Sequence, residues 1–143
     1  MNFQGVLMNV ADLNRSIAFY REVLDFTLLS QKDQLAAVSA PGSDRAQVIV
    51  LRAQGSGPVG GAGHIGLQAV VLEVESDDRL ERIASELDSR EALVSRHEHS
   101  EWTAVVGRDP DRVAIVVVWH PGGGLLPEGS WRTLDDFLYG IGD

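Results

Sequence analysis

The sequence predicts an α+β fold built from two consecutive modules, each with the element order βαβββ. Short apolar stretches typical of strands surround two segments whose apolar residues recur at helical spacing. The same order of elements occurs twice along the chain, as in a structural repeat. A segment with five glycines and a proline, residues 55–63, separates the two occurrences and is predicted to be a linker.

The first module is expected at about residues 3–53. Residues 3–10 form an apolar strand, and Asp12 is predicted to cap a helix because its carboxylate can accept hydrogen bonds from the free amides of the first turn. The helix is expected to end near Leu24 and Asp25, and its apolar face comprises Leu13, Ile17, Tyr20 and Leu24. Three strands follow at residues 26–30, 34–39 and 46–51, with polar turns at 31–33 and 41–44.

The second module is expected at about residues 64–120. A strand at 66–75 precedes a helix that Ser76 or Asp77 caps, and strands follow at 93–97, 102–106 and 113–119. The remaining residues, 121–143, form a tail with a short helix from about Trp131 to Tyr139. The apolar residues of this helix suit packing against a partner or against the edge of the module.

The composition excludes several functional classes. The chain has 143 residues, a formal net charge of −9 and no cysteine. The negative charge argues against nucleic-acid binding, which needs clustered Lys and Arg, but is compatible with a cationic ligand. The lack of cysteine removes disulfides and thiolate chemistry. No signal peptide or membrane anchor is evident, so we expect a soluble cytoplasmic protein with no membrane partner.

Two motifs resemble those of a known family. The segment from Asn9 to Tyr20 leads from a strand into Asp-Leu, Ser and Phe-Tyr, and Leu24 follows at the helix end. Residues 109–111 are Asp-Pro-Asp and precede the last apolar strand. Both are similar to the motifs of the vicinal oxygen chelate superfamily, which includes glyoxalases, bleomycin resistance proteins and dioxygenases. The resemblance covers residues 3–120.

This resemblance implies that the sheets of the two modules curl together into a cupped cavity, and it implies a homodimer. Many members hold a divalent metal in this cavity with His, Glu, His and Glu from the first and last strands of each module. In this chain those positions are Gly5, Val50, Ala69 and Val116, which cannot bind a metal through their side chains. Arg112 also replaces the glycine that is usual after the Asp-Pro-Asp turn. We therefore predict no metal and no other cofactor.

Other side chains remain as candidates for a site. Trp102 could stack on a flat ligand, with core packing as the alternative, and Arg52 and Glu73 could orient a ligand, with simple exposure to solvent as the alternative. His64, His97 and His99 are possible metal ligands at displaced positions, although a solvated hairpin suits the last two better. His120 is expected to be exposed. The sequence assigns no catalytic residue.

Three functional hypotheses follow. The first is a protein that binds a small organic ligand without a metal, as the metal-free relatives similar to bleomycin resistance proteins do. The second is a metal-dependent enzyme of the glyoxalase or dioxygenase type with displaced ligands. The third is a non-catalytic protein that binds a partner or has a structural role. Because fold does not determine function, these alternatives stay open at the level of sequence.

Overall fold

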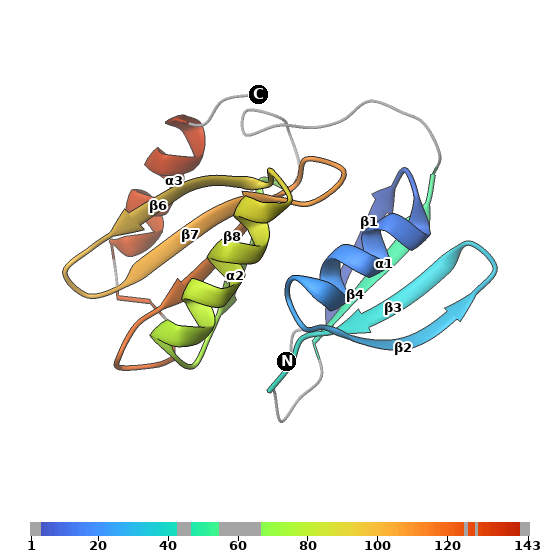
Figure 1. The fold of residues 1–143 in the computed structure, drawn as a ribbon, viewed down its shortest axis with the longest axis horizontal. Helices are drawn as coiled ribbons and strands as arrows, with labels where there is room; N and C mark the ends of the chain where they lie inside the picture. The colour runs from blue at the N-terminus through green and yellow to red at the C-terminus, as the bar shows by residue number, and fades with distance from the viewer. Residues whose placement is uncertain (1–3, 43–46, 55–66, 125, 128, 141–143) are drawn as a thin grey trace. The chain divides into compact units, whose positions relative to one another are not determined.

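The computed structural model describes residues 4–42, 47–54, 67–124, 126–127 and 129–140 (Figure 1). The chain divides into two compact units, residues 1–58 and 59–143, here called module 1 and module 2. The predicted linker at 55–63 lies outside the described residues. None of the described helices is long and apolar enough to cross a membrane.

Module 1 contains the predicted order of elements. They are β1 (Gly5–Val10), α1 (Leu13–Glu22), β2 (Thr27–Lys32), β3 (Leu35–Ser39) and β4 (Val48–Ala53). The strands form one open, mixed sheet in the order β1-β4-β3-β2, in which β1 and β4 are parallel and the other pairs are antiparallel. Two edge strands remain, β1 and β2, so the sheet does not close on itself.

Helix α1 covers one face of this sheet. Its N-cap is Asp12, as predicted, and the carboxylate accepts a hydrogen bond from the amide of Arg15 at 3.1 Å. Tyr20 is fully buried on the inner side of the helix, where its hydroxyl donates to the sulfur of Met8 on β1. The ring of Tyr20 also packs edge-on against the ring of Phe26, with 5.5 Å between the ring centroids. This contact holds the segment between α1 and β2 against the helix.

Module 2 repeats this architecture and adds one helix. Its elements are β5 (Ala69–Glu73), α2 (Asp77–Ser89), β6 (Leu93–Glu98), β7 (Thr103–Arg108), β8 (Ala114–Trp119) and α3 (Ser130–Gly140). The strand order β5-β8-β7-β6, with β5 parallel to β8, reproduces the topology of module 1. The predicted repeat of two βαβββ modules is therefore confirmed.

Helix α2 packs on one face of the module 2 sheet through Leu80, Ile83 and Leu87, all of which are buried. Of the two predicted caps, Ser76 takes the role, and its side chain accepts a hydrogen bond from the amide of Arg79. A Cβ atom at Gly107 on β7 would lie 2.8 Å from both methyl carbons of Leu87, closer than real contacts allow. Glycine at this position therefore lets the helix approach the sheet.

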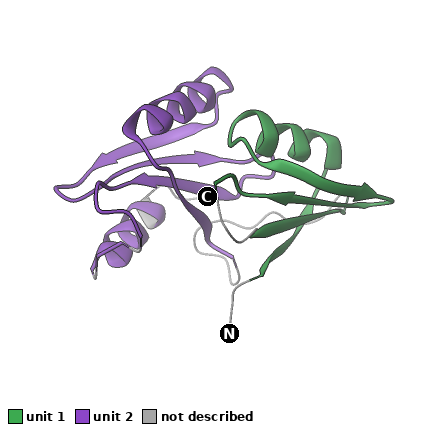
Figure 2. Ribbon diagram, turned by 90° about the horizontal axis from the view of Figure 1, so that it is seen from below, with its two compact units in different colours: residues 1–58 green, residues 59–143 purple. Residues whose placement is uncertain are grey.

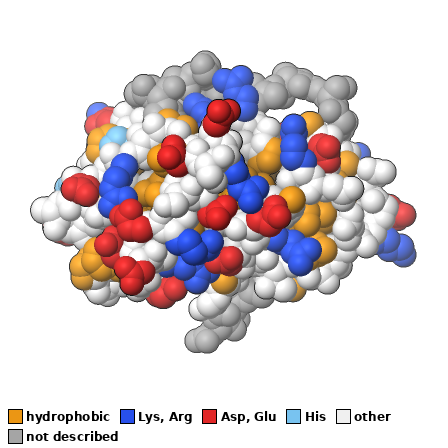
Figure 3. All heavy atoms as spheres, in the orientation of Figure 1, with side chains coloured by type: hydrophobic (Ala, Val, Ile, Leu, Met, Phe, Trp, Pro, Cys, Tyr) orange, Lys and Arg blue, Asp and Glu red, His pale blue; other side chains and the backbone are white. Residues whose placement is uncertain are grey.

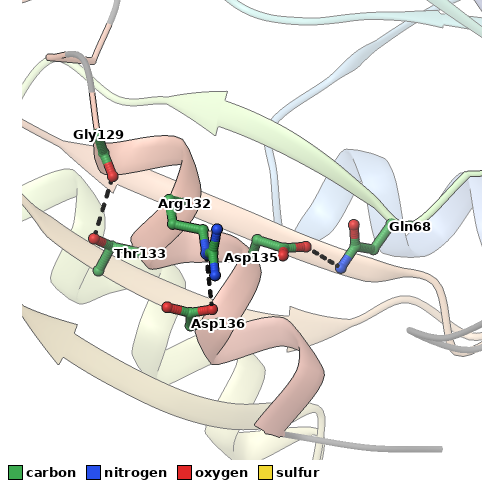
Figure 4. Close-up of polar contacts among 6 residues, drawn as sticks. All are labelled: Gln68, Gly129, Arg132, Thr133, Asp135 and Asp136. Atoms are coloured by element: carbon green, nitrogen blue, oxygen red, sulfur yellow. Dashed lines mark hydrogen bonds and ion pairs between the residues drawn. The ribbon is translucent and has the colours of Figure 1, made fainter.

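Helix α3 lies on the opposite face of the same sheet, as Figure 2 shows. Leu126, Leu134 and Leu138 of the tail pack against a cluster of apolar residues from β7 and β8. The indole N–H of buried Trp102 donates to the hydroxyl of Ser130 at 2.9 Å. At the level of β5, the amide of Gln68 donates to the carboxylate of Asp135 at 3.2 Å (Figure 4). The tail helix thus packs on its own module, not merely at its edge.

Some boundaries differ from those predicted. Strand β2 continues through Gln31 and Lys32, which were expected in a turn, because Asp33 adopts a positive φ of 56° and makes a tighter reversal possible. Helix α1 ends at Glu22, two residues before the predicted end, and Asp25 then takes a φ of 58°. Polar residues that tolerate the left-handed region allow both changes of direction.

The turn between β7 and β8 depends on buried Asp109. One carboxylate oxygen accepts hydrogen bonds from the amides of Asp111 at 2.8 Å and Val113 at 2.9 Å. Arg112, which stands where glycine is usual, has a φ of 70°. A residue with a Cβ atom is strained in this left-handed region of φ. The turn therefore keeps its backbone conformation without glycine, at a cost in stability.

We expect Arg112→Gly to raise the free energy of unfolding by about 0.5–1 kcal/mol, because relief of the left-handed strain exceeds the entropy that glycine adds to the unfolded chain. Arg112→Ala is the matched control, since it removes the same side chain but keeps the Cβ atom. Urea unfolding of both variants measures the effect. A gain for the alanine variant equal to that for glycine would show that strain is not the cause.

Ser130→Ala should lower the free energy of unfolding by about 1–3 kcal/mol, because it leaves the buried indole N–H of Trp102 without an acceptor. Thr133→Ala is the control from the same helix, since the hydroxyl of Thr133 makes only an exposed bond of 3.3 Å to the carbonyl of Gly129 (Figure 4). Equal effects of the two substitutions in urea unfolding would contradict the anchoring role of the Trp102–Ser130 bond.

Candidate functional site

The four positions that correspond to the family's metal ligands lie on the sheet faces turned away from α1 and α2. In module 1, Gly5 on β1 and Val50 on β4 belong to the face opposite α1. In module 2, Ala69 on β5 and Val116 on β8 belong to the face that α3 covers. None of these four residues places a side-chain donor atom on its sheet face.

The first of these positions has no room for any side chain. A Cβ atom at Gly5 would lie 1.9 Å from the carbonyl oxygen of Val48 on the neighbouring strand. Even the smallest side chain would therefore force the backbones of β1 and β4 apart. A histidine ligand at Gly5 is excluded by this close approach of the two strands as well as by residue type.

The last of these positions is closed by the tail. Val116 is fully buried within the cluster that includes Leu126, Leu134 and Leu138. A carboxylate at Val116 would be desolvated by these apolar side chains and would have no partner charge among them. The part of the sheet that holds a metal ligand in many relatives is occupied here by apolar residues of the same chain.

The described residues contain no cluster of three or more His, Cys, Asp or Glu side chains able to hold a metal. Two possible donor side chains do lie close together in module 2, where Nε2 of His120 is 3.9 Å from a carboxylate oxygen of Glu73. The same nitrogen lies 3.2 Å from the carbonyl oxygen of Gly124. These residues do not fit the metal that the family would imply.

Of the three side chains proposed from sequence as ligand contacts, Trp102 and Glu73 belong to module 2 and Arg52 belongs to module 1. Trp102 is 1% exposed and bonded to Ser130, so that its ring is part of the interface between the module 2 sheet and α3. Glu73 is exposed at the end of β5, beside His120. Arg52 belongs to module 1, where it is exposed on β4 and donates to the side-chain oxygen of Gln54 at 2.8 Å.

The histidines have different surroundings. His97 on β6 is half-buried, and its ring stacks on Phe137 of α3 at 3.7 Å, while Nε2 lies 2.8 Å from the hydroxyl of Ser95. His99, just beyond β6, is exposed and stacks on Trp102 at 4.9 Å. The side chain of His120 is only 9% exposed, so the expectation that it would be exposed was wrong. His64 lies outside the described residues.

The stacking of His97 on Phe137 was not predicted, because periodicity does not show on which surface a tail helix packs. Burial against this helix lowers the pKa of His97 below its ordinary value of 6.5. The only sequence signal for this contact was the apolar face of the tail, which suited several partners equally well. The ring pair joins β6 to α3 in addition to the leucine contacts.

A groove also lies on the helix side of module 1, between α1 and β2. Its lining is mixed and includes Ile17, Arg21, Asp25 and Phe26, and it contains none of the residues proposed as ligand contacts from sequence. The groove is wide open to solvent, whereas small-molecule sites bury most of the ligand surface. It is not a convincing binding site.

The lowered pKa of His97 gives a prediction for stability against pH. The neutral ring is favoured in the folded state, so stability is full above the unfolded pKa near 6.5 and is lost as the pH falls below it. Between about pH 7.5 and pH 5.5, the wild-type protein should therefore lose more stability than His97→Gln, which does not titrate there. Urea unfolding at the two pH values measures the difference, and an equal loss in both proteins would contradict the prediction.

Comparison with solved structures agrees with this fold. A glyoxylase/bleomycin resistance protein/dioxygenase domain from Frankia sp. EAN1pec is 24% identical, with a TM-score of 0.69, and the match covers 85% of this chain and 92% of that one. A lactoylglutathione lyase from Agrobacterium tumefaciens is 17% identical, with a TM-score of 0.64, over 87% and 98%. A fosfomycin resistance protein from Listeria monocytogenes is 12% identical, with a TM-score of 0.69, over 87% and 95%.

These similarities show the fold, and the neighbours are named for several different activities. No curated protein matches the sequence. The family model for the glyoxalase/bleomycin resistance protein/dioxygenase superfamily matches residues 3–117, which is most of the chain and extends from β1 in module 1 into β8 of module 2. The chain therefore belongs to the glyoxalase/bleomycin resistance protein/dioxygenase superfamily.

Proposed function

We propose that this protein binds a small organic molecule without a metal ion, in the manner of the bleomycin resistance members of its superfamily. One observation carries the proposal: the positions where relatives hold a metal are closed to metal donors. At Gly5 a side chain would collide with the carbonyl of Val48, and at Val116 the tail buries the position in apolar contacts. Restoring a metal site would need more than a change of residue type.

An uncovered sheet face supports a binding role. In module 1 the face opposite α1 carries Leu7, whose side chain is 77% exposed, and Leu35, which is 46% exposed. Exposed leucines on a sheet mark a surface that gains free energy when an apolar partner covers it. The corresponding face of module 2 is already covered by α3, so among the described residues only the module 1 sheet presents exposed leucines to a ligand.

A metal-dependent enzyme with displaced ligands is the alternative. Among the described residues such a site would have to use His97, His99 or the Glu73–His120 pair, and the third displaced candidate, His64, lies outside them. His97 is held by Phe137 and Ser95, and the pair alone supplies two donors, fewer than the three protein ligands of a typical catalytic zinc site. These contacts favour the metal-independent proposal.

A homodimer in the cytoplasm remains part of the proposal. The dimer rests on the family resemblance. The tail helix, which the sequence suggested as a dimer contact, directs Leu134 and Leu138 to its own sheet, although Trp131 stays 50% exposed and available to a partner. Sedimentation of the wild-type protein and of Trp131→Ala would test whether this residue contributes to association.

Metal content tests the proposal against the enzyme alternative. Untagged protein incubated with nickel, iron, manganese or zinc and then desalted should retain no stoichiometric metal by mass spectrometry, because the described residues present no adequate donor set. The variants His97→Gln and His64→Gln should give the same result as the wild type. Retention of one metal ion per chain, lost in either variant, would overturn the metal-independent proposal.

A further inference from the structure

The charge of the chain is distributed unequally between the two modules. Residues 1–58 contain five basic and five acidic residues, and residues 59–143 contain seven basic and sixteen acidic residues. Module 1 is therefore formally neutral, and module 2 carries the whole net charge of −9. The overall charge, which is compatible with a cationic ligand, does not describe the surroundings of the uncovered face.

The uncovered face of module 1 contains no acidic residue. Cross-strand pairing places directly opposed residues on the same face, so the face opposite α1 consists of three rows of side chains. The rows comprise Asn9, Arg52, Leu35 and Lys32; Leu7, Val50, Ala37 and Ser30; and Gly5, Val48, Ser39 and Thr27. None of the four strands of module 1 contains Asp or Glu at any position.

The first row is basic and polar, and the second is mainly apolar. Arg52 and Lys32 flank Leu35, and Asn9 pairs with Arg52 across β1 and β4. Among the described residues, neither Arg52 nor Lys32 forms an ion pair with a carboxylate, and Arg52 donates only to the uncharged Gln54 at 2.8 Å. Two cations without acidic partners among the described residues thus border an apolar strip that includes exposed Leu7 and half-buried Val50.

The other charged surfaces of the protein differ from this one. In module 2, basic side chains on and beside α2 pair with carboxylates: Arg79 with Glu75, Arg90 with Glu86 and Arg96 with Glu81. Acidic and basic side chains are interspersed in the space-filling view of Figure 3. Paired charges of this kind favour solubility, whereas an unpaired cation beside an apolar strip can take part in recognition of an anion.

We propose that the ligand is a small organic anion with a flat apolar body, such as an aromatic carboxylate, and that it binds to the uncovered face of module 1. This inference rests on the proposed function and specifies its ligand class. The apolar body lies over Leu7 and Val50, and the guanidinium of Arg52 donates to the oxyanion, with Asn9 on the neighbouring strand and Lys32 on the far side of Leu35. Arginine suits this role because its planar donors match a carboxylate in a two-bond geometry.

Three probes of equal size and different charge test the proposal on the full chain: naphthoate, the neutral naphthylmethanol and the cationic naphthylmethylammonium. By calorimetry at low salt, naphthoate should bind about tenfold more tightly than the neutral probe, as a charge-assisted hydrogen bond predicts. Arg52→Gln should reduce naphthoate binding to the level of the neutral probe. Leu7→Ala should weaken both probes alike, because Leu7 contacts the shared ring system.

Arg15→Gln is the matched control, because it removes an exposed arginine from α1 on the other side of the same sheet and should leave binding unchanged. Equal or tighter binding of the cationic probe, or naphthoate binding that Arg52→Gln does not alter, would overturn the inference while ligand binding itself stands. Binding of none of the probes would also overturn it, and the metal-content experiment still judges the proposed function separately.

Sedimentation is the final check. If the protein is a dimer and Leu7→Ala or Arg52→Gln dissociates it, a second copy of the chain covers this face and the inference is overturned.

Discussion

The packing of α3 on the module 2 sheet is the contact that distinguishes the two halves of this protein. A four-stranded sheet has two faces, and in each module a helix of the βαβββ unit covers only one of them. In module 2 the tail covers the second face with Leu126, Leu134 and Leu138, and the bond from Trp102 to Ser130 fixes its start. In module 1 the described residues provide no second helix, so Leu7 remains exposed there. The asymmetry between two similar modules therefore arises from about fifteen residues outside the repeat.

This asymmetry explains why residues at the family's ligand positions could become apolar. Once the tail covers the face that contains Val116, a charged side chain at that position loses its water without gaining a partner, so valine is the more stable residue. In module 1 the change is different in kind, because β1 and β4 approach so closely at Gly5 that no Cβ atom fits. These two positions are thus closed to a metal-binding side chain by separate physical causes, burial at Val116 and backbone proximity at Gly5. The open face of module 1 is left as the surface on which binding can be sought.

Much of the fold could be predicted from the sequence because its signals are local. Asp12 and Ser76 cap helices through their own side chains, and the spacing of Leu80, Ile83 and Leu87 defines a helix face directly. Strand ends were less well predicted where a non-glycine residue such as Asp33 takes a positive φ. The position of α3 could not be predicted, since its apolar face suits any apolar surface and the choice depends on contacts distant in sequence, such as that between His97 and Phe137. For the same reason the sequence left Trp102 as either a ligand-stacking or a core residue, and its bond to Ser130 could not be predicted.

The proposed ligand binding needs no metal ion, and a titration with and without a chelator tests this most directly. The full chain is titrated with naphthoate after treatment with a chelator and, in parallel, after addition of nickel or zinc. The geometry at Gly5 and Val116 predicts the same Kd under both conditions. Binding that is abolished by the chelator and restored by the metal would contradict the account, and would show that donors elsewhere in the chain form a metal site.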